Sequence, residues 1–410
     1  MSWYPQQPNP EQLEAIEHGS GALRVLAGAG TGKTQVIEYR TARLVKSGIN
    51  PTSIVLLTFT RKASRSMLAR AARHDPRCTQ VMGGTYHSFA NLLLRQYGGL
   101  IGLPSSFSIL DGNDSEDYID LARAKHDLSR YEKRFPSKSQ LSKMFQLAFQ
   151  LQLSLADVLT RFYPAYVEYA EAVESIRKSY AKMKLDAWSL DYNDLLLFTS
   201  VLLEQHAEPI RNRFKYIMVD EYQDTSGVED EIIMRLAAPA FNLMVVGDEA
   251  QAIYSFKGAQ IKNILAFDER VPNVHTVRLT RNYRSYQPIL TLATSAINQS
   301  KLKFSKELTA SRVGEGTLPR LMVFKDEVEE ADWLCSEILG KREEGIPLSE
   351  QAVLVRAMAR SYALQIALKT KNIPYVVVGG LKIFEAAHVK DVLSYLRVLE
   401  NHRDKAAWLR

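Results

Sequence analysis

The stretch from Ala22 to Thr34 constrains the fold of this chain more than any other part of the sequence. A short apolar run, Leu23 to Leu26, leads into a glycine-rich turn, and Lys33 then opens a segment that we expect to be helical to about Ser47. Glycines permit the positive φ angles that aim successive backbone N–H groups at one point, and the positive end of a helix faces that point as well. The order of strand, turn and helix therefore predicts an α/β fold with a cradle for a polyphosphate.

Two side chains that open the helix suit a nucleotide with its metal ion. Lys33 is expected to reach the β- and γ-phosphates, and Thr34 to hold Mg²⁺. The usual pattern has glycine six residues before the lysine, where this chain has Ala27, so a strand–loop–helix turn with chance glycines is the alternative. The backbone expected to surround the phosphates comprises Ala27, Gly28, Ala29, Gly30, Thr31 and Gly32.

A second motif, further along the chain, favours the nucleotide interpretation. The apolar run Phe214 to Val219 is followed directly by Asp220 and Glu221. Paired carboxylates at a strand end are the expected partners of a phosphate loop, with Asp220 holding Mg²⁺ and Glu221 orienting and activating the attacking water. By themselves, two acids at a strand end would be read as a solvated turn.

The next apolar run, 241–246, precedes a loop that combines an amide with aromatic and basic residues. Gln251 would contact a γ-phosphate from a neighbouring strand end. Tyr254, Phe256 and Lys257 offer the aromatic faces and the cation on which single-stranded bases stack, although both rings could instead belong to the core. A phosphate sensor and a base platform in one segment would link nucleotide state to the grip on DNA.

Two further apolar runs, 54–58 and 81–84, lead into polar segments. In a parallel sheet whose strands are joined by helices, these segments lie at the same edge as the phosphate loop. A lone histidine is usually structural, and we weigh that role equally with DNA contact for His87. The residues expected to contact DNA here are Phe59, Arg61, Thr85, Tyr86 and His87.

The rest of the chain divides by its pattern. Helical periodicity replaces strand-like runs between 114 and 190, and basic residues gather there at Arg130, Lys133, Arg134, Lys138 and Lys143, on either a solvated face or a DNA-binding one. A second α/β pattern begins with a strand at 274–279, and further strands are expected at 321–324, 352–355 and 375–378. We expect a first domain at 1–113 and 191–278, a helical insertion at 114–190, part of a second domain at 279–380, and the lead-in to a second insertion at 381–410.

Composition narrows the class of protein only mildly. The 410 residues, 46% of them hydrophobic, can form more than one core, and a net charge of +6 agrees with a polyanionic partner without requiring one. Cys78 and Cys335 lie far apart, as expected of thiols in a reducing compartment. The start has no signal-peptide pattern and no apolar run is long enough for a membrane span, so a cytoplasmic protein is expected.

These motifs, in this order, resemble the motif set of the UvrD/Rep/PcrA-like superfamily 1 DNA helicases, and they extend over nearly the whole chain. The matching stretches are Gln12, Ala27–Thr34, Thr58–Thr60, Gly84–Phe89, Asp220–Asp224, Gly247–Gly258 and Asn282–Ser285. The resemblance implies two RecA-like domains with ATP and Mg²⁺ between them, single-stranded DNA across their top, 3′-to-5′ translocation, and unwinding of DNA at junctions of single and double strands in DNA repair or replication restart.

Carried over by position, the resemblance assigns a role to each matching side chain. Gln251 couples the γ-phosphate to the aromatic residues Tyr254 and Phe256, and Glu221 is the catalytic base. The ligand contacts it implies are adenine with Gln12 and Tyr283, phosphates with Lys33 and Arg284, and magnesium with Thr34 and Asp220.

Some expected features of the resemblance are missing or altered. Arg61, Gln35 and Phe256 stand where the family often has Asn, Arg and Trp. We find neither the family's late strand-to-loop segment nor its later arginine, so we expect an N-terminal portion of a longer protein that binds ATP but does not unwind duplex DNA by itself. An ATP-gated single-stranded DNA-binding module is the alternative function, and RNA a weaker alternative substrate. The sequence leaves protein partners and oligomeric state open.

Overall fold

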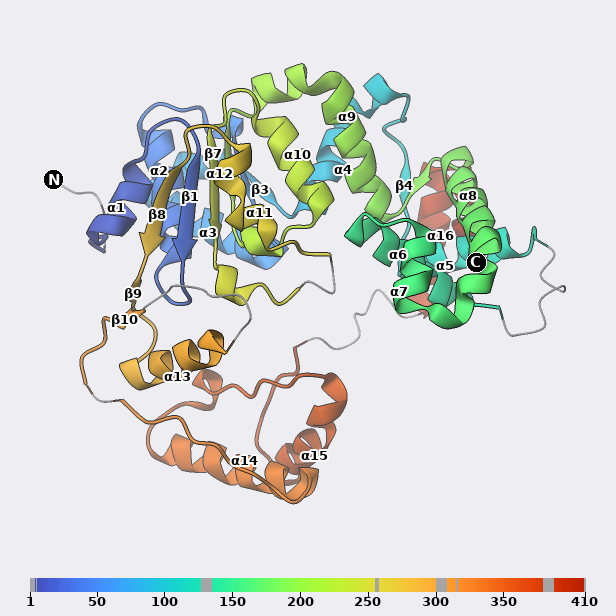
Figure 1. Cartoon of the computed structure of the whole chain (residues 1–410). Coiled ribbons are helices and arrows are strands. Elements are labelled where there is room, and N and C mark those ends of the chain that lie inside the picture. The colour runs from blue at the N-terminus through green and yellow to red at the C-terminus, as the bar shows by residue number, and fades with distance from the viewer. Residues whose placement is uncertain are drawn as a thin grey trace. The chain divides into compact units, whose positions relative to one another are not determined.

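The computed structural model describes residues 4, 6–126, 135–254, 258–299, 308–314, 316–378 and 387–408 (Figure 1). By their contacts the residues form two compact units, and each is described by itself. Unit 1 comprises Met1–Thr317 and Asp391–Arg410, and unit 2 comprises Leu318–Lys390. Unit 1 contains the sheet that carries the motifs.

Six parallel strands form this sheet, in the order β3-β2-β6-β7-β1-β8. Continuous apolar runs suit such strands because both faces of the sheet are covered. Since all pairs are parallel, the carboxyl ends of all six strands lie at one edge. The strands are β1 (Leu23–Ala27), β2 (Ile54–Leu57), β3 (Met82–Gly84), β6 (Tyr216–Val219), β7 (Leu243–Gly247) and β8 (His275–Leu279).

Helices cover both faces of the sheet, so that successive side chains of a strand enter opposite cores. On β2, Leu56 belongs to one buried cluster and Leu57 to the other. The first cluster is completed by α1 (Pro10–Glu17), α2 (Lys33–Lys46) and α3 (Arg61–His74). The second is completed by α4 (Tyr86–Tyr97), α9 (Tyr192–Arg213) and α10 (Gly227–Ala237), together with α11 (Lys262–Leu265) and α12 (Phe267–Arg270). The prediction of a parallel α/β domain is confirmed.

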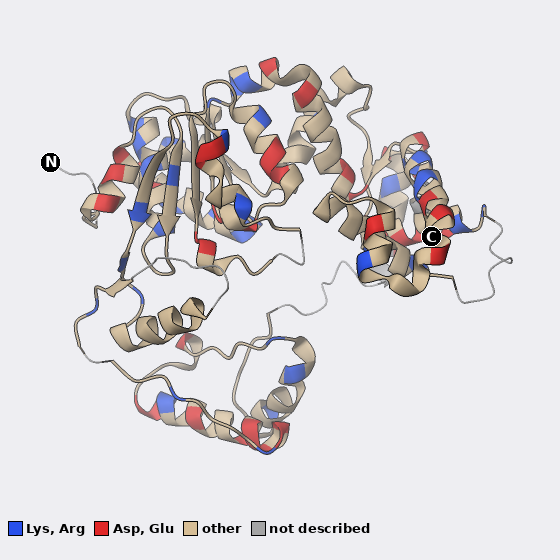
Figure 2. Ribbon diagram, viewed as in Figure 1, with Lys and Arg blue, Asp and Glu red and all other residues tan. Residues whose placement is uncertain are grey.

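The helices between two short strands that pair in parallel, β4 (Ser108–Ile109) and β5 (Ser189–Leu190), form a core of their own. This part of the chain, which corresponds to the expected insertion, is called the helical insertion below. Its helices are α5 (Gly112–Arg123), α6 (Lys138–Leu151), α7 (Leu155–Phe162) and α8 (Ala170–Asp186). Acidic and basic residues are interspersed on these helices (Figure 2), and Lys138 Nζ lies 2.7 Å from Asp117 Oδ1. Three members of the expected basic cluster, Arg130, Lys133 and Arg134, lie outside the described residues.

After β8 the chain forms a short parallel pair, β9 (Arg281–Asn282) with β10 (Thr309–Ala310), and the helix α13 (Gln287–Asn298). In unit 2, α14 (Glu327–Glu343) packs on α15 (Tyr362–Thr370) through Ala331, Cys335, Leu364 and Leu368. The helices α16 (Ala387–Glu400) and α17 (Lys405–Trp408) follow. Within the described ranges, no helix combines the length and the apolar content that crossing a membrane requires.

The three strands expected in the second α/β pattern are not formed, and these predictions are wrong. The segments 321–324, 352–355 and 375–378 carry no strand pairing. Their apolar side chains are open to solvent, as the exposures of Leu321 (91%), Leu354 (95%) and Val376 (88%) show. An apolar run becomes a strand only where a neighbouring strand satisfies its backbone, and the described part of unit 2 supplies none.

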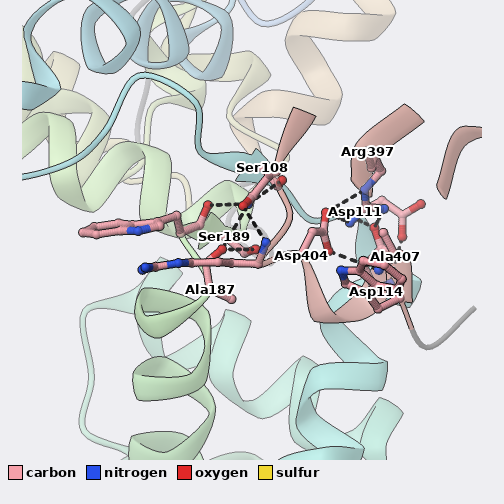
Figure 3. A network of polar contacts seen from close by, with 12 residues as sticks. Ser108, Asp111, Asp114, Ala187, Ser189, Arg397, Asp404 and Ala407 are labelled. Atoms are coloured by element: carbon pink, nitrogen blue, oxygen red, sulfur yellow. Dashed lines mark hydrogen bonds and ion pairs between the residues drawn. The ribbon is translucent and has the colours of Figure 1, made fainter. Parts of the chain in front are cut away.

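A polar seam joins the end of the described chain to the helical insertion (Figure 3). On α16, Arg397 Nη1 lies 2.6 Å from Asp114 Oδ2 of α5, and Arg397 Nη2 lies 2.9 Å from Asp404 Oδ2. The Asn401 amide donates to Ser108 Oγ and to the carbonyl of Ala187, both at 3.0 Å. The seam therefore connects residues almost 300 positions apart within unit 1.

Candidate functional site

The phosphate loop lies between β1 and α2, as the sequence predicts. Gly30 and Gly32 have φ angles of +70° and +89°, which other residues rarely adopt. The Thr31 hydroxyl donates to the carbonyl of Gly28 at 2.8 Å and closes the turn from inside. Ala27 ends β1 with its side chain buried in the core. The alanine at the position six residues before Lys33, where glycine is usual, therefore leaves the strand intact. These features form the concave backbone that an anion at a helix N-terminus requires.

Gln12 is buried and tied to this loop. Its Nε2 donates to the carbonyl of Thr31 at 2.9 Å, and its Oε1 accepts from the backbone N–H of Asn9 at 3.1 Å. Asn9 in turn caps α1, so the start of the helix and the loop form one polar cluster. The adenine contact expected of Gln12 stays a prediction.

The carboxyl pair after β6 faces the lysine of the loop. Lys33 Nζ lies 3.0 Å from Glu221 Oε2. Asp220 is buried, and its Oδ1 has no hydrogen-bond partner among the described residues. Burial, followed by the charge of Glu221, raises the pKa of Asp220 to about 7, although Lys33 acts in the opposite direction. A buried carboxylate oxygen without a partner, beside the helix that begins with Lys33 and Thr34, suits a divalent cation.

Gln223 is a residue of the site that sequence reasoning missed. Its Nε2 donates to Glu221 Oε2 at 2.9 Å, and its Oε1 accepts from the backbone N–H of Asp248 at 2.9 Å. Asp248 also accepts from Gln251 Nε2 at 2.7 Å. The chain of contacts therefore runs from Glu221 at the end of β6 to Gln251 beyond β7. The signal was the amide between two acids in Asp220–Asp224, which is too common a pattern to stand out by itself.

The structure brings two of the expected DNA-binding aromatic residues together. The rings of Phe59, after β2, and Tyr254, after β7, are stacked with centroids 5.1 Å apart and planes 21° apart. Phe59 is 44% exposed, and Arg61 is exposed at the start of α3. Phe256 and Lys257 lie outside the described residues.

The third expected DNA-binding segment, at the start of α4, is less accessible. Thr85 caps the helix by accepting from the backbone N–H of Ser88. Tyr86 is buried in the core. Burial lowers the pKa of His87, so a neutral imidazole is favoured. Its ring meets the ring of Tyr192 edge-on, with the centroids 5.7 Å apart. DNA contact by these residues stays a prediction.

The segment after β8 also contacts the phosphate loop. The backbone N–H of Tyr283 donates to the carbonyl of Gly30 at 2.8 Å, and its hydroxyl accepts from Asn9 Nδ2 at 3.1 Å. Asn282 Nδ2 donates to the carbonyl of Ala29 at 2.5 Å. A Cβ at Gly30 would lie 2.7 Å from Arg284 Cβ, so the two segments are in close contact. The role of Asn282 was not expected from the sequence.

Comparison with known proteins shows the family to which the chain is related. A family model of the UvrD/REP helicase N-terminal domain matches residues 8–272, and one of the UvrD-like helicase C-terminal domain matches residues 277–410. A protein of Staphylococcus epidermidis named ATP-dependent DNA helicase PcrA is 34% identical over 405 residues, which cover 97% of this chain and 54% of that protein. The PcrA protein of Staphylococcus aureus strain Mu50 is 32% identical over 408 residues, with the same shares.

The chain spans about half the length of these curated relatives. The two family models match adjacent parts of the chain and leave only residues 1–7 and 273–276 unmatched. This chain belongs to the family of UvrD/Rep-like helicases.

Proposed function

We propose that the chain binds ATP and single-stranded DNA as the motor part of a 3′-to-5′ DNA helicase that acts at junctions of single and double strands in DNA repair or replication restart. The observation that carries the proposal is the set of groups at the carboxyl edge of the sheet. There the phosphate loop with Lys33 lies against Glu221, and the stacked rings of Phe59 and Tyr254 follow two strands of the same sheet. The relatives named ATP-dependent DNA helicase PcrA support the same activity.

In this proposal the loop and the carboxyl pair hold ATP with Mg²⁺. Thr34 and Asp220 would hold the metal, which supplies positive charge to the phosphate oxygens. Lys33 and Arg284 would bind the phosphates, and Glu221 would orient the attacking water and accept its proton. Gln12 and Tyr283 would hold adenine.

Gln251 would couple the γ-phosphate to the DNA. Its contact with Asp248 is continuous, through Gln223, with Glu221, and it lies three residues before Tyr254. A displacement of this loop would therefore change the stacking surface formed with Phe59. The same proposal includes DNA contact by the other expected residues, Arg61, Thr85, Tyr86, His87, Phe256 and Lys257.

The domain boundaries are also part of the proposal. We assign the first ATP-binding domain to 1–113 and 191–278, the helical insertion to 114–190, part of the second domain to 279–380, and the lead-in to another insertion to 381–410. The two family matches, which divide between 272 and 277, support the boundary between the first and second domains.

The test is ATP hydrolysis with Mg²⁺, with and without single-stranded DNA. Wild type should hydrolyse ATP faster with DNA. Lys33→Ala should abolish nucleotide binding, and Glu221→Gln should keep binding but lose turnover. Glu231→Gln, which alters a carboxylate paired with Arg235 on α10, is the matched control and should behave as wild type.

Turnover of Glu221→Gln at the wild-type rate would refute the assignment of the base. DNA binding that depends on ATP without measurable hydrolysis would instead favour an ATP-gated binding module. Translocation direction is measured separately, from dissociation kinetics on oligonucleotides labelled at the 3′ or the 5′ end.

A further inference from the structure

Three consecutive carbonyls of the phosphate loop each accept a hydrogen bond from outside the loop. The carbonyl of Ala29 accepts from Asn282 Nδ2 at 2.5 Å, that of Gly30 from the Tyr283 N–H at 2.8 Å, and that of Thr31 from Gln12 Nε2 at 2.9 Å. In a planar trans peptide the carbonyl and the following N–H point in opposite directions. A carbonyl held away from the loop centre therefore turns the next N–H toward it.

Among these three partners, Asn282 also holds the turn that carries Arg284. Its Oδ1 accepts from the backbone N–H groups of Arg284 and Ser285, both at 2.8 Å. This is the turn closure that asparagine side chains favour. The residue is 1% exposed, so these contacts are largely shielded from water.

We propose that Asn282 is a positioning residue of the nucleotide site. Through Nδ2 it orients the Ala29–Gly30 peptide so that the Gly30 N–H faces the phosphates, and through Oδ1 it fixes the turn that presents Arg284. This inference rests on the proposed binding of ATP at the loop. One side chain then sets the distance between the two groups that hold the same phosphates from opposite sides.

The side chain of Asn282 must be an amide because it has to donate and accept within a closely packed space. A Cβ at Gly30 would lie 2.7 Å from Asn282 Nδ2, so no larger group fits between loop and turn. An atom at that position must donate to Ala29, while the atom at the Oδ1 position must accept. A carboxylate satisfies only the second requirement, since it has no donor.

The main chain of Asn282 has a separate structural role that the experiment must not disturb. Its carbonyl accepts from the backbone N–H of Ser311 at 2.7 Å and supports the pair of β9 and β10. Side-chain substitutions leave this bond in place. Thr280, two residues earlier, supplies a matched control because its hydroxyl donates to Glu11 Oε1 on α1 at 3.1 Å rather than to a carbonyl of the phosphate loop.

The experiment compares wild type, Asn282→Asp, Asn282→Ala and Thr280→Val. For each, ADP affinity is measured by fluorescence titration, ATP hydrolysis gives kcat and KM, and the ³¹P resonance of bound ADP reports the surroundings of the β-phosphate. Single-strand DNA affinity without nucleotide checks the integrity of the rest of the site.

We expect ADP to bind Asn282→Asp roughly tenfold more weakly, the effect of one charge-assisted hydrogen bond to a phosphate lost from the aligned loop. The ³¹P resonance should shift, Asn282→Ala should lose more affinity because the turn is released as well, and Thr280→Val should match wild type. DNA affinity without nucleotide should stay within about twofold in all variants.

Wild-type ADP affinity and an unshifted ³¹P resonance in Asn282→Asp would overturn the inference. An equal loss of nucleotide and DNA affinity in that variant would also overturn it, because the effect would then be general damage to the fold. Failure of wild type to bind ADP at all would refute the proposed function instead, so the two failures are distinguishable.

Discussion

At the scale of single residues, the site is arranged by amides that contact the expected functional groups rather than by those groups alone. Gln12 and Asn282 hold carbonyls of the phosphate loop, and Gln223 holds the carboxylate of Glu221. An amide can donate and accept at once, so each of these side chains joins two segments of the chain.

Gln223 gives the first prediction. Gln223→Met, similar in volume, removes both the donor to Glu221 and the acceptor for Asp248. We expect kcat for DNA-stimulated ATP hydrolysis to fall by up to about a hundredfold because the base loses its orientation. Nucleotide affinity should change little. Steady-state kinetics combined with nucleotide titration measure both quantities, and an unchanged kcat would show that Glu221 is held in place without Gln223.

The aromatic pair gives the second prediction. Tyr254→Ala should weaken single-strand binding by about 1–3 kcal/mol, with little dependence on base sequence, if bases stack on this surface. Phe59→Ala should have a similar effect, and the double variant should be less than additive because the two rings contact each other. Tyr254→Phe, which keeps the ring, is the control. Fluorescence anisotropy with labelled oligonucleotides measures the affinities, and wild-type binding in both alanine variants would assign the rings to the core.

At the scale of helices and strands, the sequence predicted the sheet of unit 1 well. Runs such as Ile54–Leu57 and Leu243–Gly247 are apolar throughout because both faces of each strand are buried, and their order through helices placed the motifs at one edge. Similar runs at 321–324 and 352–355 predicted strands that do not form. Composition indicates that a segment can be a strand, but not whether a neighbour is present to pair with it.

The same limit applies to the site. Asp220 and Glu221 could be predicted because they follow a strand directly. The contacts of Asn282 with Ala29 and of Thr280 with Glu11 join positions more than 250 residues apart. No local periodicity reports such pairs, so their roles became visible only in the folded chain.

An ion pair between α2 and α3 gives a prediction about the pH dependence of stability. Glu38 is buried on α2, and its Oε1 lies 2.6 Å from Arg70 Nε of α3. Burial raises its pKa from 4.5 to about 7, although the charges of Arg70 and Arg73 act in the opposite direction. Between these values the folded protein binds more protons than the unfolded chain, so the free energy of unfolding should fall as the pH rises from about 4.5 to about 7.

Glu38→Gln cannot ionise and should flatten this part of the pH profile. Urea unfolding at several pH values between 5 and 8 measures it. Glu17→Gln is the control because Glu17 is exposed and its partner Arg43 is 3.5 Å away. A slope in Glu38→Gln equal to that of wild type would assign the pH dependence to other groups.

At the scale of the whole molecule, the helical insertion has two attachments. Its chain runs from β4 to β5, and it also contacts the end of the described chain through Arg397 (Figure 3) and through Asn401. Asp404 is fully buried, so its charge depends on Arg397 for compensation.

Arg397→Ala should therefore destabilise this seam by about 3–5 kcal/mol, since it leaves the buried carboxylates of Asp114 and Asp404 without their partner. Hydrogen exchange should become faster in α5 and in residues 391–408. Arg403→Ala, an exposed change nearby, is the control. Unaltered exchange in Arg397→Ala would show that the remaining contacts of the seam suffice to hold it.

This seam also has a consequence for a chain that has been cut. Residues 318–390 are joined by the backbone to unit 1 at both ends. The residues that follow them are held by side-chain contacts with α5, with β4 and with the carbonyl of Ala187. A single protease cut at the exposed turn around Gly345 would break the backbone but not these contacts. The two fragments should therefore elute together in a native column and separate only in denaturant, so that the protein could be produced as two complementary pieces that reassemble.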